Sequence, residues 1–377
     1  MLARAVTIAV RYLSIRRQFR DRDSDLLNGP EISALDYTTV QIRVLPLLAT
    51  TFALHYSGKA MLELFERVRS GSNALEGDQV QLAELHVTSA GLKSLATELA
   101  ANGIETCRRA MGGHGFGGGT GLVQLNADYL AKPTVEGDNW MITQQVARHL
   151  LKTVGQVMHG KSNPKNQTEK IFAAYQRYNS QPPLFSSLDN PSNIVEAFRC
   201  RTSYLAFEAY EKREVQRWSW NSLLVHFHKL SRAYSQTMLV ANFWEALQAL
   251  DLRSVATMCV LKDVFRLFAF GAIDADAREF QRSGAVSLEF LDQLPDQILA
   301  LMEEIRPHAV RLVDSFALPD YLLDSALGRY DGRVYEDLYH RAHVLNPLNR
   351  TTFNPNYKDD EIVMGSGDGF ESVLAKL

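Results

Sequence analysis

Residues 112–121 read GGHGFGGGTG, and seven of these ten residues are glycine. The chain then reads VEGDN at residues 135–139, where Glu136 lies fifteen positions after Gly121. A glycine run this dense exposes bare backbone, and backbone N–H groups are what hold phosphate groups in many proteins. A carboxylate that follows such a loop is a candidate base beside a bound nucleotide or cofactor.

The glycine stretch does not match the two common phosphate-binding motifs. The dinucleotide fingerprint follows a strand, whereas this stretch follows a helical pattern. The stretch also lacks the Lys-Ser/Thr pair of a P-loop. A flexible glycine hinge is the structural alternative.

Helical periodicity surrounds this stretch on both sides. The pattern predicts a first helix over about residues 2–19, a second over 36–68 bent at Pro46, a third over 79–111 and a fourth that begins near Gly137. No segment of residues 1–155 shows the alternation of a strand. The sequence therefore predicts an all-α fold, with a helical bundle as its first unit.

Residues 159–193 differ from the rest, because Asn, Ser, Pro and Gly dominate on both sides of a short helical piece. This composition is typical of a linker. We therefore expect four parts: a bundle over 1–158, the linker over 159–193, a second helical domain over 194–348 and a polar tail over 349–377. Within the second domain the pattern predicts helices over 194–250, 252–270, 287–305 and 330–343.

Composition limits the classes of function. The net charge is −3 and the pI about 6.4, so no global basic field favours nucleic acid or anionic lipid. No apolar run reaches the ~18 residues of a membrane helix. Three widely spaced cysteines suit a reducing compartment. His226 and His228 lie two apart and point to different faces of a helix, so we expect no metal site there.

The two ends of the chain carry possible targeting signals. Five arginines precede the first acid, Asp21, which is the composition of a mitochondrial transit peptide, but the apolar spacing of the same segment also fits an ordinary core helix. The last three residues, 375–377, read Ala-Lys-Leu, a close variant of the Ser-Lys-Leu peroxisomal address. The flanking tail is polar, as a receptor-read signal requires. The expected localisation is the peroxisome, and the expected partner there is its import receptor.

Glu136 is the candidate base. Its successors Asp138 and Asn139 are good helix caps, so Glu136 is on one reading only an acid near the start of a helix, favoured by the helix dipole. On the other reading, residues 133–135 form an apolar approach that desolvates the carboxyl group and raises its pKa, as a base requires.

Arg16-Arg17-Gln18-Phe19 is expected to end the first helix. A cation at a helix C-terminus complements the dipole, which is the structural explanation. The functional one is a guanidinium that contacts a pyrophosphate, with a flat aromatic ring beside an adenine.

Taken together, these segments resemble the C-terminal half of an acyl-CoA oxidase of the acyl-CoA dehydrogenase superfamily. The resemblance spans nearly the whole chain, and it is most specific where Gly-Gly-His-Gly is followed by Glu-Gly-Asp-Asn. The matching segments are 7–12, 16–19, 45–50, 85–86, 90–93, 107–108, 112–116, 136–139, 144–148, 327–332 and 334–335.

The resemblance implies FAD as the cofactor, with fatty acyl-CoA and molecular oxygen as substrates. Glu136 matches the base that removes the α-proton, and its backbone N–H would help to polarise the thioester carbonyl, with Gly137 beside it at the substrate. The β-hydrogen leaves as hydride to the flavin, and oxygen becomes hydrogen peroxide. The positions that match contacts to FAD, several of them across a homodimer, are Arg16, Gln18, Phe19, Gly112, Gly113, Asp138 and Asn139. The implied fold is a four-helix bundle followed by a second helical domain peculiar to oxidases.

The chain departs from the family in one major respect. Family members carry an N-terminal helical domain and a β-barrel domain, and Met1 falls within their third domain. We expect a fragment, a shortened gene product, or a separate polypeptide that supplies the missing half. Gly117, Gly118 and Gly119 also replace larger residues.

Two alternatives keep the fold. One is a non-catalytic helical module for dimerisation or regulation, and the other is an acyl-CoA dehydrogenase that uses a different electron acceptor. Acyl chain length and branching preference have no signature in the sequence.

Overall fold

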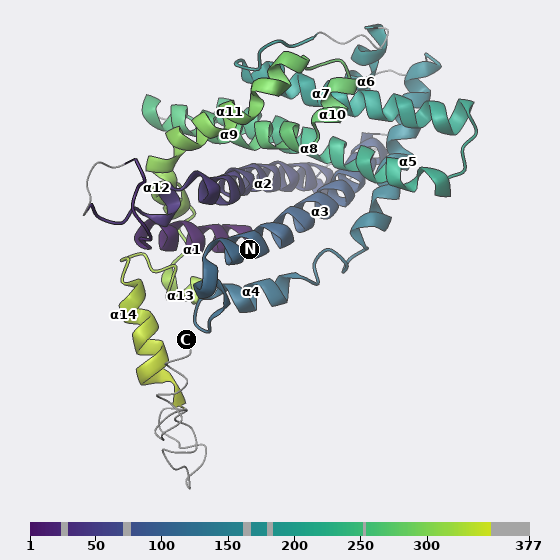
Figure 1. Cartoon of the computed structure of the whole chain (residues 1–377). Coiled ribbons are helices and arrows are strands. Elements are labelled where there is room, and N and C mark those ends of the chain that lie inside the picture. The colour runs from purple at the N-terminus through teal and green to yellow at the C-terminus, as the bar shows by residue number, and fades with distance from the viewer. Residues whose placement is uncertain (24–28, 71–76, 161–166, 179–183, 252–253, 348–377) are drawn as a thin grey trace, which may run out of the picture.

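A computed structural model describes residues 1–23, 29–70, 77–160, 167–178, 184–251 and 254–347. In this part of the chain the secondary structure is helical, with isolated bridges but no strand (Figure 1). The expected all-α class is therefore confirmed. The α-helices are α1 Leu2–Ile15, α2 Thr38–Ser70, α3 Gly77–Ala110, α4 Leu122–Tyr129, α5 Asn139–Met158, α6 Gln167–Arg177, α7 Pro191–Tyr210, α8 Leu224–Ala249, α9 Val255–Ala275, α10 Ala277–Arg282, α11 Leu288–Ile305, α12 Ala309–Asp314, α13 Asp320–Leu323 and α14 Val334–Tyr339.

Helices α2 and α3 are long and lie side by side, with α1 along one half of their length (Figure 1). Residues 5–13 of α1 are all buried, so this helix lies inside the molecule, packed against α2, α3 and α12. Pro46 lies inside α2, where its ring leaves one helical hydrogen bond unmade. The unmade bond is the one that the Ile42 carbonyl would accept, and the Pro46 carbonyl also accepts from Thr50 Oγ1 at 2.8 Å. Both long helices begin and end within two residues of the predicted bounds.

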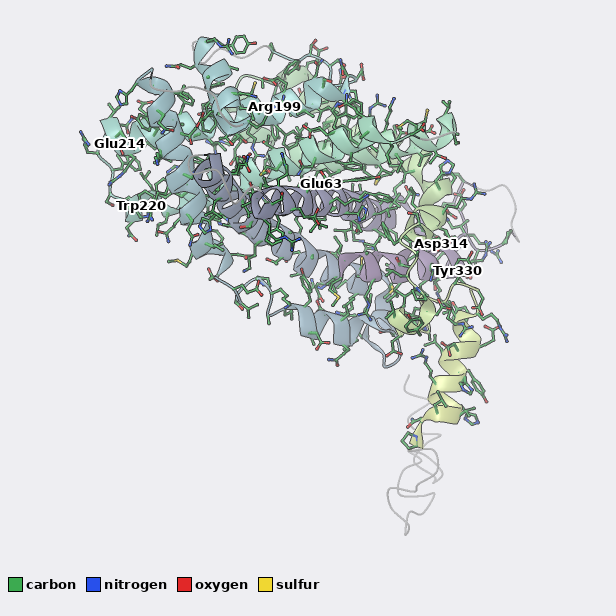
Figure 2. The ribbon with its side chains drawn as sticks, turned by 180° about the vertical axis from the view of Figure 1, so that it is seen from behind. Glu63, Arg199, Glu214, Trp220, Asp314 and Tyr330 are labelled. Carbon is green, nitrogen blue, oxygen red and sulfur yellow. The ribbon has the colours of Figure 1, made fainter. Side chains whose placement is uncertain are left out.

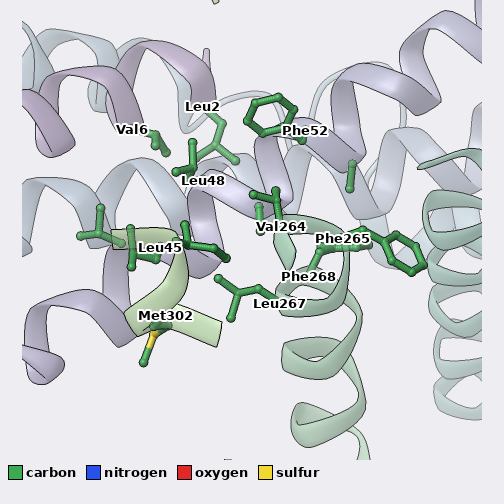
Figure 3. Close-up of a cluster of buried hydrophobic side chains, with 14 of the residues drawn as sticks. Leu2, Val6, Leu45, Leu48, Phe52, Val264, Phe265, Leu267, Phe268 and Met302 are labelled. Atoms are coloured by element: carbon green, nitrogen blue, oxygen red, sulfur yellow. The ribbon is translucent and has the colours of Figure 1, made fainter. Parts of the chain in front are cut away.

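A second layer of helices, formed by α7, α8, α9 and α11, covers α2 and α3 (Figure 1). Leu45 and Phe52 of α2 pack against Phe265 of α9 and Met302 of α11 (Figure 3). All of these side chains are buried. Residues on the two sides of the expected 159–193 linker thus share one hydrophobic core.

Arg201 of α7 is 1% exposed and lies in a network of charges. Its guanidinium donates to Glu279 at 2.7 Å, to Asp276 at 3.0 Å and to Gln236 at 2.6 Å. A buried guanidinium costs free energy unless its donors are satisfied, and these partners satisfy them. The network ties α7 to α8 and to the start of α10.

The C-terminal helices return to α1. Arg11 of α1 donates to Asp314 at 3.0 Å and to the Gly328 carbonyl at 2.7 Å, and its guanidinium lies 5.2 Å from the ring centroid of Tyr330. Figure 2 places Asp314 and Tyr330 close together at this end of the molecule. The amide of Ala326 donates to the carbonyl of Gly119, so the same segment holds the glycine loop.

Three sequence-based expectations need correction. The first helix ends at Ile15 rather than at Phe19, because Arg16 adopts an extended conformation. The expected helix over 194–250 is two helices, separated by a π-helical turn and a loop over residues 211–223 in which Arg217 has a φ of 57°. Helix α4 was not expected, since it is short.

None of the described helices is apolar enough over enough residues to cross a membrane. The Ala-Lys-Leu terminus and the rest of the 349–377 tail lie outside the described residues.

Candidate active site

Glu136 lies in the turn that joins α4 to α5. The turn is closed by the amide of Val135, which donates to Ala131, and by the amide of Asn139, which donates to the carbonyl of Pro133 at 3.0 Å. Glu136 has a φ of 60° and Gly137 a φ of 101°. A non-glycine residue in this left-handed region costs about 1–3 kcal/mol and persists only where its surroundings hold it.

The expected apolar approach to Glu136 is wrong for this chain. Residues 133–135 form a turn rather than a strand-like segment, and Val135 is 42% exposed. Glu136 itself is exposed. Its carboxylate therefore faces outward from the turn, where another polypeptide or a substrate can reach it.

Asp138 and Asn139 both have partners within the chain. The carboxylate of Asp138 caps α5 and accepts from the amides of Trp140 and Met141 at 2.9 and 3.3 Å, as a helix cap should. Asn139 is 4% exposed, and its amide donates to the carbonyl of Ser94 at 2.9 Å. The two residues shape the turn, and their contact with a cofactor stays a prediction.

The glycine loop begins where α3 ends and forms a 3₁₀ turn, Gly112–Phe116. Gly115 has to be glycine, because a Cβ there would lie 1.9 Å from the carbonyl oxygen of Arg108. A Cβ at Gly112 or Gly113 would meet no atom within 4 Å, so this backbone is open to solvent. The loop is therefore anchored at one glycine and exposed at two others.

Glu105 organises the side chains beside the loop. It forms ion pairs with Arg108 at 2.7 Å and with Arg109 at 2.6 Å, and these hydrogen bonds lower the pKa of Glu105 to about 2. The paired Arg108 guanidinium lies 4.0 Å from the ring centroid of Phe116. The exposed ring of Phe116 is thus held against the end of α3.

The segment after α1 lies at the same end of the molecule. Arg16 donates to Gln18 Oε1 at 2.5 Å and to the hydroxyl of Tyr335 at 3.3 Å, and its hydrogen bond to Tyr335 raises the pKa of Arg16. Phe19 has a φ of 60° and is 69% exposed. One helical turn before Arg16, the hydroxyl of Tyr12 lies 3.0 Å from His114 Nδ1 in the glycine loop. Tyr12 thus links the end of α1, which leads into Arg16, Gln18 and Phe19, to the glycine loop.

Glu136 is remote from this cluster. Its turn is anchored at Lys93 of α3, whereas the glycine loop begins after Ala110 of the same helix. At 1.5 Å per residue these points are about 25 Å apart along α3. The structure thus separates the predicted site residues into two groups. The Glu136 group is Glu136, Gly137, Asp138 and Asn139, and the Arg16 group is Arg16, Gln18, Phe19, Gly112 and Gly113.

An apolar groove of about 510 Å³ adjoins the Glu136 group. It runs between α2 and α3 in front of the N-terminus of α1, and Lys93 and Tyr129 line it on the side of the Glu136 turn. Its walls include Leu54, Met61, Leu92 and Ala96.

Three side chains near the two groups escaped the sequence reasoning. Lys93 hydrogen-bonds the Glu136 turn, Tyr335 positions Arg16, and His228 stacks on Trp140 with the ring centroids 3.8 Å apart. Burial lowers the pKa of His228. Lys93 and Tyr335 fall in matched segments and His228 was considered only as a metal ligand, but their distance in sequence from the motifs hid these contacts.

Two family descriptions match the chain. Residues 1–151 match "Acyl-CoA oxidase, C-alpha1 domain", and residues 190–360 match "Acyl-CoA oxidase". Together with the helical fold, these matches define the class. The chain belongs to the acyl-CoA oxidase family, and it corresponds to the C-terminal half of its members.

Curated relatives agree in sequence. The chain is 34% identical over 363 residues to "Putative peroxisomal acyl-coenzyme A oxidase 1.2" of Arabidopsis thaliana, which takes in 95% of this chain and 53% of that protein. It is 33% identical to "Peroxisomal acyl-coenzyme A oxidase 1" of Rattus norvegicus, over 94% of this chain and 54% of the relative. The chain thus spans about half the length of the curated relatives it matches.

Solved structures agree in fold. Acyl-CoA oxidase 1 of Arabidopsis thaliana superposes with a TM-score of 0.84 at 31% identity, over 100% of this chain and 55% of that one. Acyl-CoA oxidase-1 of Caenorhabditis elegans, solved with FAD and ATP, gives a TM-score of 0.84 at 28% identity, again over 100% and 55%. The expected architecture of a bundle followed by a second helical domain is confirmed by these neighbours.

Proposed function

We propose that this chain is the half of an FAD-dependent acyl-CoA oxidase that carries the catalytic base. The enzyme would oxidise a fatty acyl-CoA to a trans-2-enoyl-CoA and reduce molecular oxygen to hydrogen peroxide, in peroxisomal β-oxidation. The observation that carries the proposal is the Glu136 turn, which holds an exposed carboxylate in a left-handed conformation within a chain of this family.

The chain's own residues perform the first step. A Glu136 carboxylate oxygen takes the α-proton of the thioester, and the electron pair left behind forms the α,β double bond as the β-hydrogen departs. The backbone N–H of Glu136 donates to the thioester carbonyl oxygen, where negative charge develops. Bound FAD would supply the acceptor for the β-hydride and the route of its two electrons to oxygen.

The Arg16 group fits a flavin dinucleotide. Arg16 and Gln18 are joined by a hydrogen bond and so present a preorganised polar pair, suited to a pyrophosphate. Exposed Phe19 offers a flat ring, and the backbone at Gly112 and Gly113 leaves room for close approach. These residues would hold FAD, together with Asp138 and Asn139 of the partner's Glu136 turn.

The distance between the two groups favours a homodimer. On one chain the Arg16 group lies about 25 Å along α3 from the anchor of the Glu136 turn. In a two-fold dimer, the Arg16 group of one subunit would lie beside the Glu136 group of the other. The symmetry repeats this contact, so the dimer would have two shared sites.

A polypeptide that carries the N-terminal half of the enzyme completes the site. The chain matches only about half the length of its relatives, and the groove beside Lys93 is apolar and open. We propose that the N-terminal half packs into this groove and encloses the substrate, because water must be excluded from the reaction. Peroxisomal delivery rests on the Ala-Lys-Leu terminus, which the import receptor would bind, and on relatives named as peroxisomal.

The test begins with the purified chain and FAD, first alone and then with the N-terminal half of a relative. Flavin absorbance that co-purifies with protein, together with peroxide release on palmitoyl-CoA, supports the proposal. A stable dimer that stays colourless in both preparations favours the non-catalytic module. Reduction of an electron-transferring flavoprotein without peroxide favours the dehydrogenase.

A further inference from the structure

Lys93 reaches from α3 into the turn that presents Glu136. Its ammonium group donates to the carbonyl of Gly137 at 2.5 Å, to Oδ1 of Asn139 at 3.0 Å and to the carbonyl of Pro133 at 3.4 Å. An ammonium has three N–H donors, and here each has one acceptor. All three acceptors belong to the one turn, on both sides of Glu136.

These contacts hold a conformation that the turn would not adopt by itself. The Gly137 carbonyl faces Lys93 only because Glu136 and Gly137 both have positive φ. The conformation at Glu136 is costly for a residue with a Cβ, so the surroundings must stabilise it. The Gly137 carbonyl lies one peptide after the Glu136–Gly137 peptide. Its hydrogen bond with Lys93 therefore fixes the backbone at Glu136 without any contact to the Glu136 side chain.

The turn also has backbone hydrogen bonds of its own, and the other side chains of α3 that support it act on Asn139. Ser94 Oγ donates to the carbonyl of Asn139 at 2.9 Å, and Thr97 Oγ1 lies 3.0 Å from Asn139 Nδ2. Both fix the start of α5 rather than the peptide at Gly137. Among the described side chains, Lys93 hydrogen-bonds both Pro133 at one end of the turn and Gly137 and Asn139 at the other.

The charges around Lys93 are consistent with this role. Burial lowers the pKa of Lys93, while the nearby carboxylates of Glu136 and Asp138 act in the opposite direction and favour the charged ammonium. Its three hydrogen bonds are charge-assisted and are therefore stronger than neutral ones.

We infer that Lys93 is a positioning residue for the base: it clamps the 133–139 turn and thereby fixes the direction of the Glu136 carboxylate. The value of this clamp for catalysis rests on the proposed role of Glu136, but the clamp itself is a property of the free chain. Arginine cannot replace it, because a planar guanidinium does not direct three bonds at one converging set of acceptors.

Amide hydrogen exchange of the purified chain tests the clamp without any cofactor. The variant is Lys93→Met, which keeps a long apolar stem and removes the ammonium. The matched control is Lys59→Met, since Lys59 is exposed on α2. In the peptide that covers residues 131–141, we expect exchange about tenfold faster or more for Lys93→Met, with unchanged exchange for the control. In the same peptide, the exchange rate of Lys93→Arg should be much closer to that of Lys93→Met than to that of the wild type.

Equal exchange in the wild type and Lys93→Met overturns the clamp, and so does full rescue by arginine. If the methionine variant does not fold, Lys93→Gln takes its place in the same comparison, because its amide can supply no more than two N–H donors. In the assembled enzyme the clamp predicts a loss in kcat with little change in KM for Lys93→Met.

The two proposals fail separately. A loosened turn in Lys93→Met together with an active Glu136→Gln enzyme keeps the clamp and refutes the base. An unchanged turn in Lys93→Met together with an inactive Glu136→Gln enzyme refutes the clamp and keeps Glu136 as the base.

Discussion

Glu136 and Phe19 share an uncommon backbone conformation. Each is a non-glycine residue with a φ of 60°, and each is exposed on a segment held by hydrogen bonds from elsewhere. Such residues concentrate at functional sites, because a strained backbone can hold a side chain in a direction that a relaxed backbone would not give it. Each of the two groups of site residues contains one of them.

The base is tested by Glu136→Gln, which removes the carboxylate and keeps the shape of the side chain. In the assembled enzyme we expect loss of peroxide formation with palmitoyl-CoA, because no group remains to take the α-proton. FAD binding should be unchanged, because the substitution keeps the shape of the side chain and leaves the Arg16 group intact. Glu63→Gln, at an exposed glutamate on α2, should leave the rate unchanged. Oxidase activity retained by Glu136→Gln would refute this role.

The cofactor contact is tested by Arg16→Ala. Loss of a charge-assisted contact should weaken FAD binding by roughly 1.5–3 kcal/mol, measured as the dissociation constant by flavin fluorescence. The control is Arg17→Ala, because Arg17 is exposed and donates to the carbonyl of Glu31 at 2.8 Å. An Arg16→Ala protein that binds FAD as tightly as the Arg17→Ala protein contradicts the assignment.

At the scale of elements, α5 begins where the Glu136 turn ends, so its cap serves both stability and the site. Asp138→Ala removes the acceptor for two amides of the first turn and should lower the free energy of unfolding by about 1 kcal/mol. Urea unfolding measures this change. Asp292→Ala, at an exposed position within α11, is the control and should differ from the wild type by much less. Equal stabilities of the two variants would show that the cap contributes nothing.

The buried charge network of Arg201 predicts a larger effect. Arg201→Met leaves Glu279 and Asp276 without their main partner and should destabilise the chain by about 3–5 kcal/mol. Arg199→Met, which breaks a partly exposed pair with Glu196, should cost less than about 1 kcal/mol. Thermal unfolding compares the two, and similar losses would contradict the importance of the network.

The long helices could be predicted from the sequence because their pattern continues over many turns. Helices α2 and α3 follow the predicted bounds closely, and α4 was missed because eight residues carry too short a pattern. The break after Tyr210 has neither Gly nor Pro to mark it, and the chain turns instead through a π-helical segment and a left-handed Arg217.

The site residues could be named from their motifs, but their arrangement could not be predicted. No sequence signal marks the left-handed φ at Phe19 or Glu136, since neither is glycine. The contacts of Lys93 with Gly137, and of Arg16 with Tyr335, join residues far apart in the chain. Nor does the spacing of the motifs indicate that α3 separates the two groups.

At the scale of the whole molecule, the proposed function divides the candidate site residues of one chain between two partial sites. The glycine loop, the end of α1 and the start of α14 form one of them. The Glu136 turn and the apolar groove form the other. A two-fold dimer that includes the N-terminal half would bring them together as two complete sites.

The most direct test of this account is complementation between two defective variants. Glu136→Gln and Arg16→Ala chains are each assembled with the N-terminal half, alone or as an equal mixture. Peroxide formation is measured at an FAD concentration too low to saturate Arg16→Ala. In a mixed dimer one site combines the intact Glu136 of one subunit with the intact Arg16 of the other. Random pairing should restore about a quarter of the wild-type rate. A mixture no more active than its separate components would contradict the shared site.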